Sequence, residues 1–340
     1  MSLRGRALLS ASLCILAVLG LQWTFYRRVS QELNAAERRR VEAEVRRALR
    51  AVEGEVERLD VVAKDWAYWD DTYRYAVDGN EAYERSNLPP GTLVDLKVNL
   101  LLIANAQGRV VFCRAVSLPD GDLVEMPGFC RDRLPSSHPL LLPLRTGRPV
   151  KGLLATGRAP LLVACRRILT SEDEGPPHGV LAMGRLLDGV LLSELGRRLG
   201  MPLRVRRVEG GQAPGPDEVA VSLGEGDVAE GRALLRDVEG RPLCWLEAEV
   251  SRAFLRTARL GLWRSFAGMM ALALVIAAVL VWLFDRWVLA PLSRLSAQVE
   301  EVTAGRARRV ELQGENELGS LAQGVNRMLE EVERLTAHLL

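Results

Sequence analysis

The stretch FAGMMALALVIAAVLVWLF, residues 266–284, runs for nineteen residues without a charge. A helix of about 20 apolar residues covers the ~30 Å hydrocarbon core of a bilayer. Trp263, Trp282 and Trp287 lie near the two ends, where aromatic rings favour the headgroup region. We therefore predict a transmembrane helix over residues 266–285. It divides the chain into a large domain before it and a short helical module, beginning near Pro291, after it.

A second apolar run, ALLSASLCILAVLGLQWTFY, occupies residues 7–26. It ends in large residues, not in the small residues of a cleavage site, so we favour an uncleaved anchor over a cleaved signal peptide. Two crossings place both termini, including a tail at residues 1–6, on one side of the membrane. Arginines flank both runs on both sides, so the positive-inside rule does not orient the chain.

Composition excludes several functions. The net charge of the 340 residues is +2, which gives no basic field for nucleic acid. The three histidines are isolated, and neither an HExxH nor a CxxC pair is present, so we expect no metal and no cofactor. No Ser-His-Asp order or Gly-x-Ser-x-Gly motif appears, and we expect no enzymatic activity within these residues.

A long amphipathic helix is expected between Arg27 and about Asp78, a stretch with no proline and only Gly54 as glycine. Such a helix rises ~78 Å at ~1.5 Å per residue. We assign residues 27–60 to a stalk, whose apolar face packs on its own domain, pairs with a partner helix, or does both. The residues of this face recur every three or four positions: Val41, Val45, Leu49, Val52, Val56, Leu59, Val62 and Trp66.

Short strands follow. The turn Asn105-Ala-Gln-Gly108 predicts a hairpin of residues 100–104 and 109–115, and residues 160–169 and 179–185 form a second pair. We expect an α+β domain over residues 61–250, with a long amino-terminal helix and a mixed sheet, followed by a descending helix at 251–265. The remaining predicted elements are a helix at 187–199, a loop at 210–215, and strands at 205–208, 218–222, 233–238 and 243–250.

Aromatic residues concentrate in DWAYWDDTYRY, residues 65–75, which holds five of the 18 Trp, Tyr and Phe residues. On one continuous helix Trp66, Trp69, Asp70 and Tyr73 share a face. Aromatic walls with one carboxylate suit a small polar or cationic ligand. Alternatively, the same aromatic rings fasten the helix to the sheet. The sequence leaves both interpretations open.

This motif, with Tyr83, Asn87 and Asn99 after it, resembles the extracytoplasmic CHASE sensor domains of the fourth subtype. The segments GLLATGRAPLLVACRRIL, residues 152–169, and GVLAMGRLLD, residues 179–188, fit the same resemblance. The resemblance implies a fold related to Cache and PAS-like sensors and an extracytoplasmic location, and it names no ligand. Arg158 lies in a matching segment and is a candidate partner of a ligand carboxylate, or of Asp70 or Asp71.

The last segment, residues 286–340, resembles a HAMP signalling module. Two runs with apolar residues at spacings of three and four are separated by a connector containing Val310 and Leu312. Pro291, Gly305, Glu317 and Asn326 match the motif of that family, and a generic coiled coil is the alternative. Because two chains supply four such helices, we expect a homodimer with a parallel bundle. The expected relay residues are Pro291, Leu295, Val299, Glu317, Leu321, Val325 and Met328.

Five cysteines are present. In an oxidising compartment Cys113 and Cys130 are the best-placed pair, because they close a short loop beside the first hairpin, and Cys165 and Cys244 lie in strand patterns expected to bury free thiols.

These features predict a bacterial receptor of the inner membrane with two transmembrane helices. Its outer domain senses a small molecule or a partner, and its HAMP module relays the change to a cytoplasmic output outside these residues. A cyclase, phosphodiesterase or kinase output would follow in a longer chain or be supplied by a separate protein. The alternative is a structural anchor whose outer domain binds the cell wall or a protein.

Overall fold

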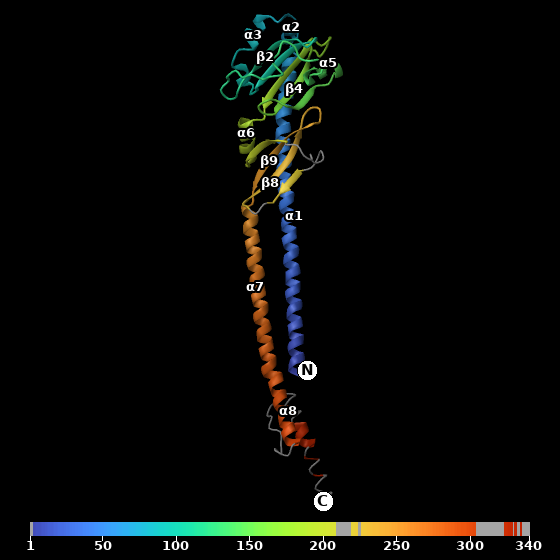
Figure 1. The fold of residues 1–340 in the computed structure, drawn as a ribbon, viewed down its shortest axis with the longest axis vertical. Coiled ribbons are helices and arrows are strands. Elements are labelled where there is room, and N and C mark those ends of the chain that lie inside the picture. The colour runs from blue at the N-terminus through green and yellow to red at the C-terminus, as the bar shows by residue number, and fades with distance from the viewer. Residues whose placement is uncertain are drawn as a thin grey trace. The chain divides into compact units, whose positions relative to one another are not determined.

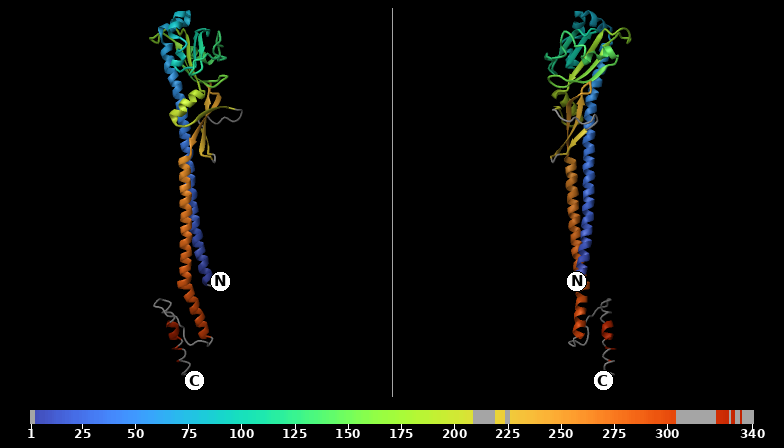
Figure 2. Two further views of the ribbon diagram at one scale, coloured as in Figure 1. Left: turned by 90° about the vertical axis from the view of Figure 1, so that its left-hand side faces the viewer. Right: turned by 45° about the vertical axis from the view of Figure 1, so that its right-hand side comes forward.

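The computed structural model describes residues 3–208, 219–223, 226–303, 323–328, 330, 331 and 334, with side chains from residue 12 onward except those of 253–256, 302 and 303. Two compact units make up the chain. One is the folded domain Leu33–Arg256, and the other combines residues 1–32 with 257–340. Figure 1 labels the elements of both units, and Figure 2 shows them from two further sides.

The amino-terminal helix α1 extends from Leu3 to Ala67 without a break. Its apolar stripe is buried, with Val45 and Leu59 fully inaccessible and Val41 and Val52 1% exposed. Residues 41–60, which the sequence assigns to a stalk, therefore belong to the core of the folded domain. The rest of the predicted helix is a separate element, α2, Asp70–Asp78.

The interruption lies at Trp69, whose backbone is extended with φ −89° and ψ 135°. The carbonyl of Ala67 accepts a hydrogen bond from the backbone N–H of Leu169, so the end of α1 is tied to the sheet. The expectation of one continuous helix to Asp78 was wrong, and with it the argument that Trp66, Trp69, Asp70 and Tyr73 share one helical face.

A five-stranded antiparallel sheet with the order β2-β1-β5-β4-β3 follows. Both predicted strand pairs are confirmed, with Leu102 opposite Cys113 in the first and Val163 opposite Gly184 in the second. All pairs are antiparallel, where the sequence led us to expect a mixed sheet. The strands are β1 Leu100–Asn105, β2 Val110–Ala115, β3 Val150–Leu154, β4 Leu161–Ile168 and β5 Gly179–Leu186.

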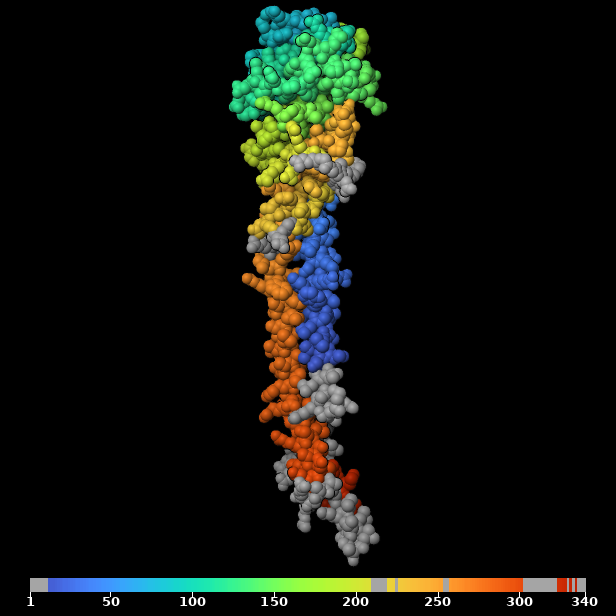
Figure 3. Space-filling model, viewed as in Figure 1, coloured from blue at the N-terminus to red at the C-terminus, as the bar shows by residue number. Residues whose placement is uncertain are grey.

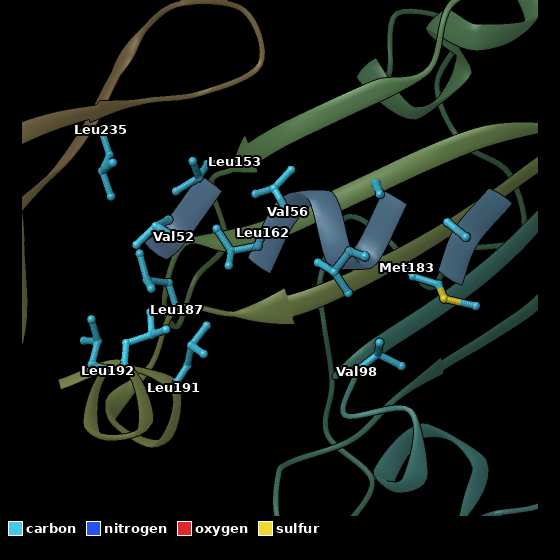
Figure 4. Packing of buried hydrophobic residues seen from close by; sticks show 14 of the residues in the cluster. Val52, Val56, Val98, Leu153, Leu162, Met183, Leu187, Leu191, Leu192 and Leu235 are labelled. Atoms are coloured by element: carbon cyan, nitrogen blue, oxygen red, sulfur yellow. The ribbon is translucent and has the colours of Figure 1, made fainter. Parts of the chain in front are cut away.

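The two faces of this sheet bury different partners. One face packs against α1 through residues such as Leu162 and Met183 (Figure 4). The other is covered by the segment between β2 and β3, including Phe129 and Leu140. Figure 3 shows the whole chain as a space-filling model, with the sheet region in teal and green. The predicted disulfide joins Cys113 of β2 to Cys130 of the segment between β2 and β3, while Cys165 and Cys244 are buried thiols as expected. The short helices η1, Pro139–Leu141, and α5, Leu142–Thr146, belong to the layer on this second face. Two others, α3 Glu81–Asn87 and α4 Thr92–Asp95, contribute Tyr83 and Leu93 to the core on the α1 side.

A second antiparallel sheet has the order β6-β9-β8-β7. It is reached through helix α6, Gly189–Leu199, which Asp188 caps through the N–H groups of Val190 and Leu191. Gly231 lies where β8 crosses α1, and a Cβ there would stand 2.3 Å from Val45 Cγ2. The close approach of helix and strand therefore requires glycine. The strands are β6 Leu203–Arg207, β7 Val219–Ser222, β8 Val228–Arg236 and β9 Pro242–Ser251, and the predicted loop 210–215 lies outside the described residues.

The second unit contains helix α7, Ala253–Phe284, the π-helical turn η2, Asp285–Leu289, and helix α8, Ala290–Thr303. Among the described residues, Thr257–Glu301 is long and apolar enough to cross a membrane. The wide turn η2 precedes Pro291, which has no N–H to donate and whose ring crowds the carbonyl four residues earlier. Within this unit Tyr26 and Phe266 contact each other, with ring centroids 4.7 Å apart.

Candidate ligand site and relay contacts

Trp66 and Trp69 form a stacked pair, with ring centroids 5.0 Å apart and planes 22° from parallel. Trp66 ends the buried stripe of α1 and is 8% exposed, while Trp69 is half-buried against the same core. Trp66 therefore fastens the helix to the sheet. Part of the Trp69 ring is left at the surface, where a ligand could reach it.

Asp70 and Tyr73 hold the beginning of α2 onto the loop between β4 and β5. The Asp70 carboxylate accepts hydrogen bonds from the backbone N–H and the hydroxyl of Ser171, each 3.0 Å long. These bonds lower the pKa of Asp70. The Tyr73 ring stacks on His178 at 3.5 Å, and its hydroxyl donates to the Pro176 carbonyl. Both polar groups are thus engaged by the domain itself.

Arg158 lies away from this cluster. It is exposed in the turn before β4, where its backbone N–H donates to Thr156 Oγ1. Ser171, the partner of Asp70, follows the opposite end of the eight-residue strand β4, which spans ~26 Å at ~3.3 Å per residue. Asp71 pairs instead with Arg74 at 2.7 Å. The structure brings Trp66, Trp69, Asp70 and Tyr73 into one region and leaves Arg158 out of it.

A hollow of the folded domain lies between α1, β3 and the second sheet, with a volume of about 440 Å³. Val52 and Val56 of α1 line it from one side, Leu153 of β3 from another and Leu235 of β8 from a third; Figure 4 labels all four. Lys151 and Arg46 contribute positive charge to its rim. We call this hollow the α1 groove. Sequence reasoning missed it, because it forms between elements that are far apart in the chain.

Three carboxylates of α1 also bind arginines outside this helix, two in the first sheet and one just after the second. Glu37 accepts two hydrogen bonds from Arg252, at 2.5 and 3.2 Å, and both residues are buried. Asp60 accepts two from Arg166 of β4, at 2.7 and 2.6 Å.

The third carboxylate, Glu55, accepts from Arg185 of β5 at 2.9 Å, and Arg185 also donates to Glu194 of α6. Burial raises the pKa of Glu194, but the hydrogen bond and the charges of the arginines outweigh burial and leave that pKa lowered. The signal for these contacts was available in the sequence: Glu55 and Asp60 adjoin the buried Val56 and Leu59, so these acids lie beside the apolar stripe.

The relay residues fall in the second unit. Leu295 is buried, Pro291 and Val299 are half-buried on α8, and Val325 is half-buried while Met328 is 70% exposed. Glu317 and Leu321 lie outside the described residues, as do the connector residues Val310 and Leu312.

Two family models match the chain: the CHASE4 domain over residues 51–206 and the HAMP domain over residues 286–334. The methanogenesis regulatory histidine kinase FilI of Methanothrix harundinacea (strain 6Ac) is 27% identical over 282 residues, which cover 81% of this chain and 32% of that protein. This chain thus spans about a third of the length of that relative.

Two solved structures are similar. An extracellular domain described as that of a histidine kinase, vpHK1S-Z8, matches with a TM-score of 0.45 and 9% identity, covering 68% of this chain and 96% of the other. The periplasmic domain of Vibrio cholerae LuxQ matches with a TM-score of 0.36 and 12% identity, covering 62% and 97%. Both scores are below 0.5, so the architecture is taken from the strand pairing above.

A sensor sheet carried on a long helix and an apolar helix leading out of the domain define the class of transmembrane sensor receptors. Within that class, this chain carries a CHASE4 domain followed by a HAMP domain.

Proposed function

We propose that these residues form the sensing and relaying part of a homodimeric receptor of the inner membrane. The folded domain lies outside the cytoplasm and responds to a small molecule or a partner. Residues 7–26 and 266–285 cross the membrane, and both termini are cytoplasmic. The HAMP module passes the response to a cytoplasmic output that lies in further sequence or in a separate protein.

The buried ion pair between Glu37 and Arg252 carries this proposal. Glu37 belongs to α1, which is continuous from Leu3 through the core to Ala67. Arg252 directly precedes α7, the helix that enters the membrane-spanning stretch. A buried carboxylate and guanidinium joined by two hydrogen bonds resist separation, because either charge alone would be desolvated without a partner. A change in α1 is therefore delivered to the residue that directly precedes α7.

The aromatic region is our candidate for one ligand contact. Trp69 leaves part of its ring at the surface beside Asp70 and Tyr73, which suits a small polar or cationic molecule bound over the β4–β5 loop. The buried ring of Trp66 stacks against Trp69 and holds it in place. Arg158 lies outside this region, so it would bind a ligand only at another place on the domain.

The relay can be tested by cross-linking in α8. Single cysteines replace Leu295, which is buried, and Ala297, which is exposed, in the full chain in membranes and in a background without Cys14. We expect the Leu295 position to form dimers faster than the Ala297 position. Glu37→Gln, which weakens the ion pair with Arg252, should change the Leu295 rate by about threefold or more, which corresponds to about 0.65 kcal/mol or more.

Glu42→Gln is the matched control, because Glu42 lies on α1 in an exposed ion pair with Arg46. This variant should leave the cross-linking rate unchanged. Equal rates in wild type and Glu37→Gln would contradict the relay and favour the structural anchor. A folding check by thermal melting accompanies both variants.

A further inference from the structure

The α1 groove combines an apolar floor with a cationic rim. Val52, Val56, Leu153 and Leu235 supply the floor and are each at most 8% exposed. The residues that line the groove include three cations and two carboxylates. The volume of about 440 Å³ lies within the range of small-molecule sites, roughly 300–1,000 Å³. These properties suit an amphipathic anion better than a cation.

Lys151 is the cation of the groove that can most easily exchange its present carboxylate partner for a ligand. Its Nζ lies 2.6 Å from one oxygen of Glu57 on α1 and 2.8 Å from the other. The two side chains are 41% and 60% exposed, and an ion pair so open to water contributes little to stability. Asp60, 3.9 Å from Lys151, is already held by Arg166. A carboxylate entering the groove therefore competes mainly with Glu57 for Lys151.

The backbone of β3 adds a second donor. β3 is an edge strand, and the carbonyl of Leu153 accepts from Val238 N–H at 3.0 Å, so it points away from β4. In an antiparallel ladder the backbone groups of alternate residues point to the same edge. The N–H of Lys151, two residues earlier, therefore also faces this edge. One residue thus offers an ammonium and a backbone N–H to the same anion.

We propose that the α1 groove binds a small aliphatic carboxylate, with its head on Lys151 and its chain on Val52, Val56 and Leu235. This site rests on the proposed receptor function and is separate from the aromatic region at Trp69. Binding replaces Glu57 on Lys151 and so removes one tie between α1 and β3. The same helix carries Glu37, whose partner Arg252 precedes α7, so the ligand acts on the helix that the relay uses.

The test measures hexanoate binding to the full chain in lipid nanodiscs by saturation-transfer NMR, with empty nanodiscs as the blank. Hexanoate should bind, and hexylamine, which carries the opposite charge on the same chain, should bind more weakly. Lys151→Gln should weaken hexanoate binding by about tenfold or more, because it removes a charged hydrogen bond. Leu49→Gln, which makes the groove wall polar, should also weaken it.

Lys64→Gln is the matched control, because Lys64 is an exposed lysine of α1 outside the groove. It should bind hexanoate as the wild type does, and Lys151→Arg should retain most of the affinity. Unchanged binding in Lys151→Gln, or preference for hexylamine, would overturn the site. If hexanoate fails to bind while Glu37→Gln still alters α8 cross-linking, the groove is rejected and the receptor function stands. If hexanoate binds as expected and Glu37→Gln leaves cross-linking unchanged, the site stands and the relay is rejected.

Discussion

At the scale of single residues, Asp70 has a measurable electrostatic signature. Its pKa is lowered from the ordinary value of 3.8 by the hydrogen bonds from Ser171, so the folded state favours the charged carboxylate. The stability from this charge is present at neutral pH and is lost as the pH falls below 3.8 through the folded-state pKa. Asp70→Asn should therefore be less stable than wild type at pH 7, with the difference vanishing in acid.

Urea unfolding at several pH values measures this effect. The same variant tests the aromatic region: a ligand that contacts Asp70 should bind Asp70→Asn more weakly, beyond any change in the melting temperature. An equal ligand response in both proteins would remove Asp70 from the ligand site and leave it as the residue that holds α2 to Ser171.

The residue types of the aromatic region were predictable, and their geometry was not. Trp66 closes a stripe with helical spacing, and its burial follows from that spacing. The helix is interrupted at Trp69, and Asp70 begins a new helix held by two donors of Ser171, about a hundred residues later. Local periodicity carries no information about such a distant partner. The position of Arg158 could not be predicted for the same reason. Arg158 precedes β4, whereas Ser171, the partner of Asp70, follows the other end of that strand.

At the scale of elements, the contact of α1 with β8 depends on one missing side chain. A Cβ at Gly231 would stand 2.3 Å from Val45 Cγ2 and 2.8 Å from Val41 Cγ1. Gly231→Ala must therefore push the strand from the helix, and overpacking of this kind costs about 1–3 kcal/mol. Gly54→Ala is the control on α1, because no atom lies within 4 Å of its Cβ position.

Alanine in place of an exposed helical glycine should stabilise the domain by about 0.5–1 kcal/mol. Denaturant unfolding of both variants should thus give shifts of opposite sign. A Gly231→Ala protein as stable as wild type would show that β8 does not pack so closely on α1.

The strands and the sensor helix follow from patterns that act over a few residues. The turn ending at Gly108 predicts β1 and β2, and Asp188 and Gly200 mark the ends of α6. The division into two antiparallel sheets does not follow, because pairing partners are chosen by burial across the whole domain. The disulfide was predictable because Cys113 and Cys130 are close in sequence and lie beside the hairpin.

At the scale of the whole molecule, the orientation across the membrane is open to direct measurement. We expect residues 27–265 outside and both termini in the cytoplasm, because a HAMP module must reach cytoplasmic partners. Single cysteines at Gly215 and Gln313, two positions outside the described residues, report on the two sides. An impermeant thiol reagent on intact cells should label the first and not the second, and the reverse result would invert the topology.

Dimerisation is the other property of the whole molecule that the sequence predicts. Each HAMP segment supplies two amphipathic helices, and Met328, expected in a bundle core, is 70% exposed in one chain. A second chain would cover such positions by completing a four-helix bundle. A ligand shifts this bundle only by its differential affinity for two packings. Val325→Asp places a charge in the core and should abolish dimers, measured by cross-linking in membranes and by mass after solubilisation.

Cross-linking at successive positions tests the dimer more directly than loss of dimers, because only a packed bundle gives a heptad pattern. Cysteines at Leu321 and Val325 should cross-link more readily than one at Gln323, because Gln323 points away from the predicted seam. Gln323→Asp, the matched control for Val325→Asp, adds the same charge outside the core and should leave dimers intact. The two aspartates differ only in the direction they face, so unequal effects identify a seam. Equal cross-linking from Leu318 to Leu329, with both aspartates tolerated, would mean that these helices form no bundle and that the receptor relays its signal in another way.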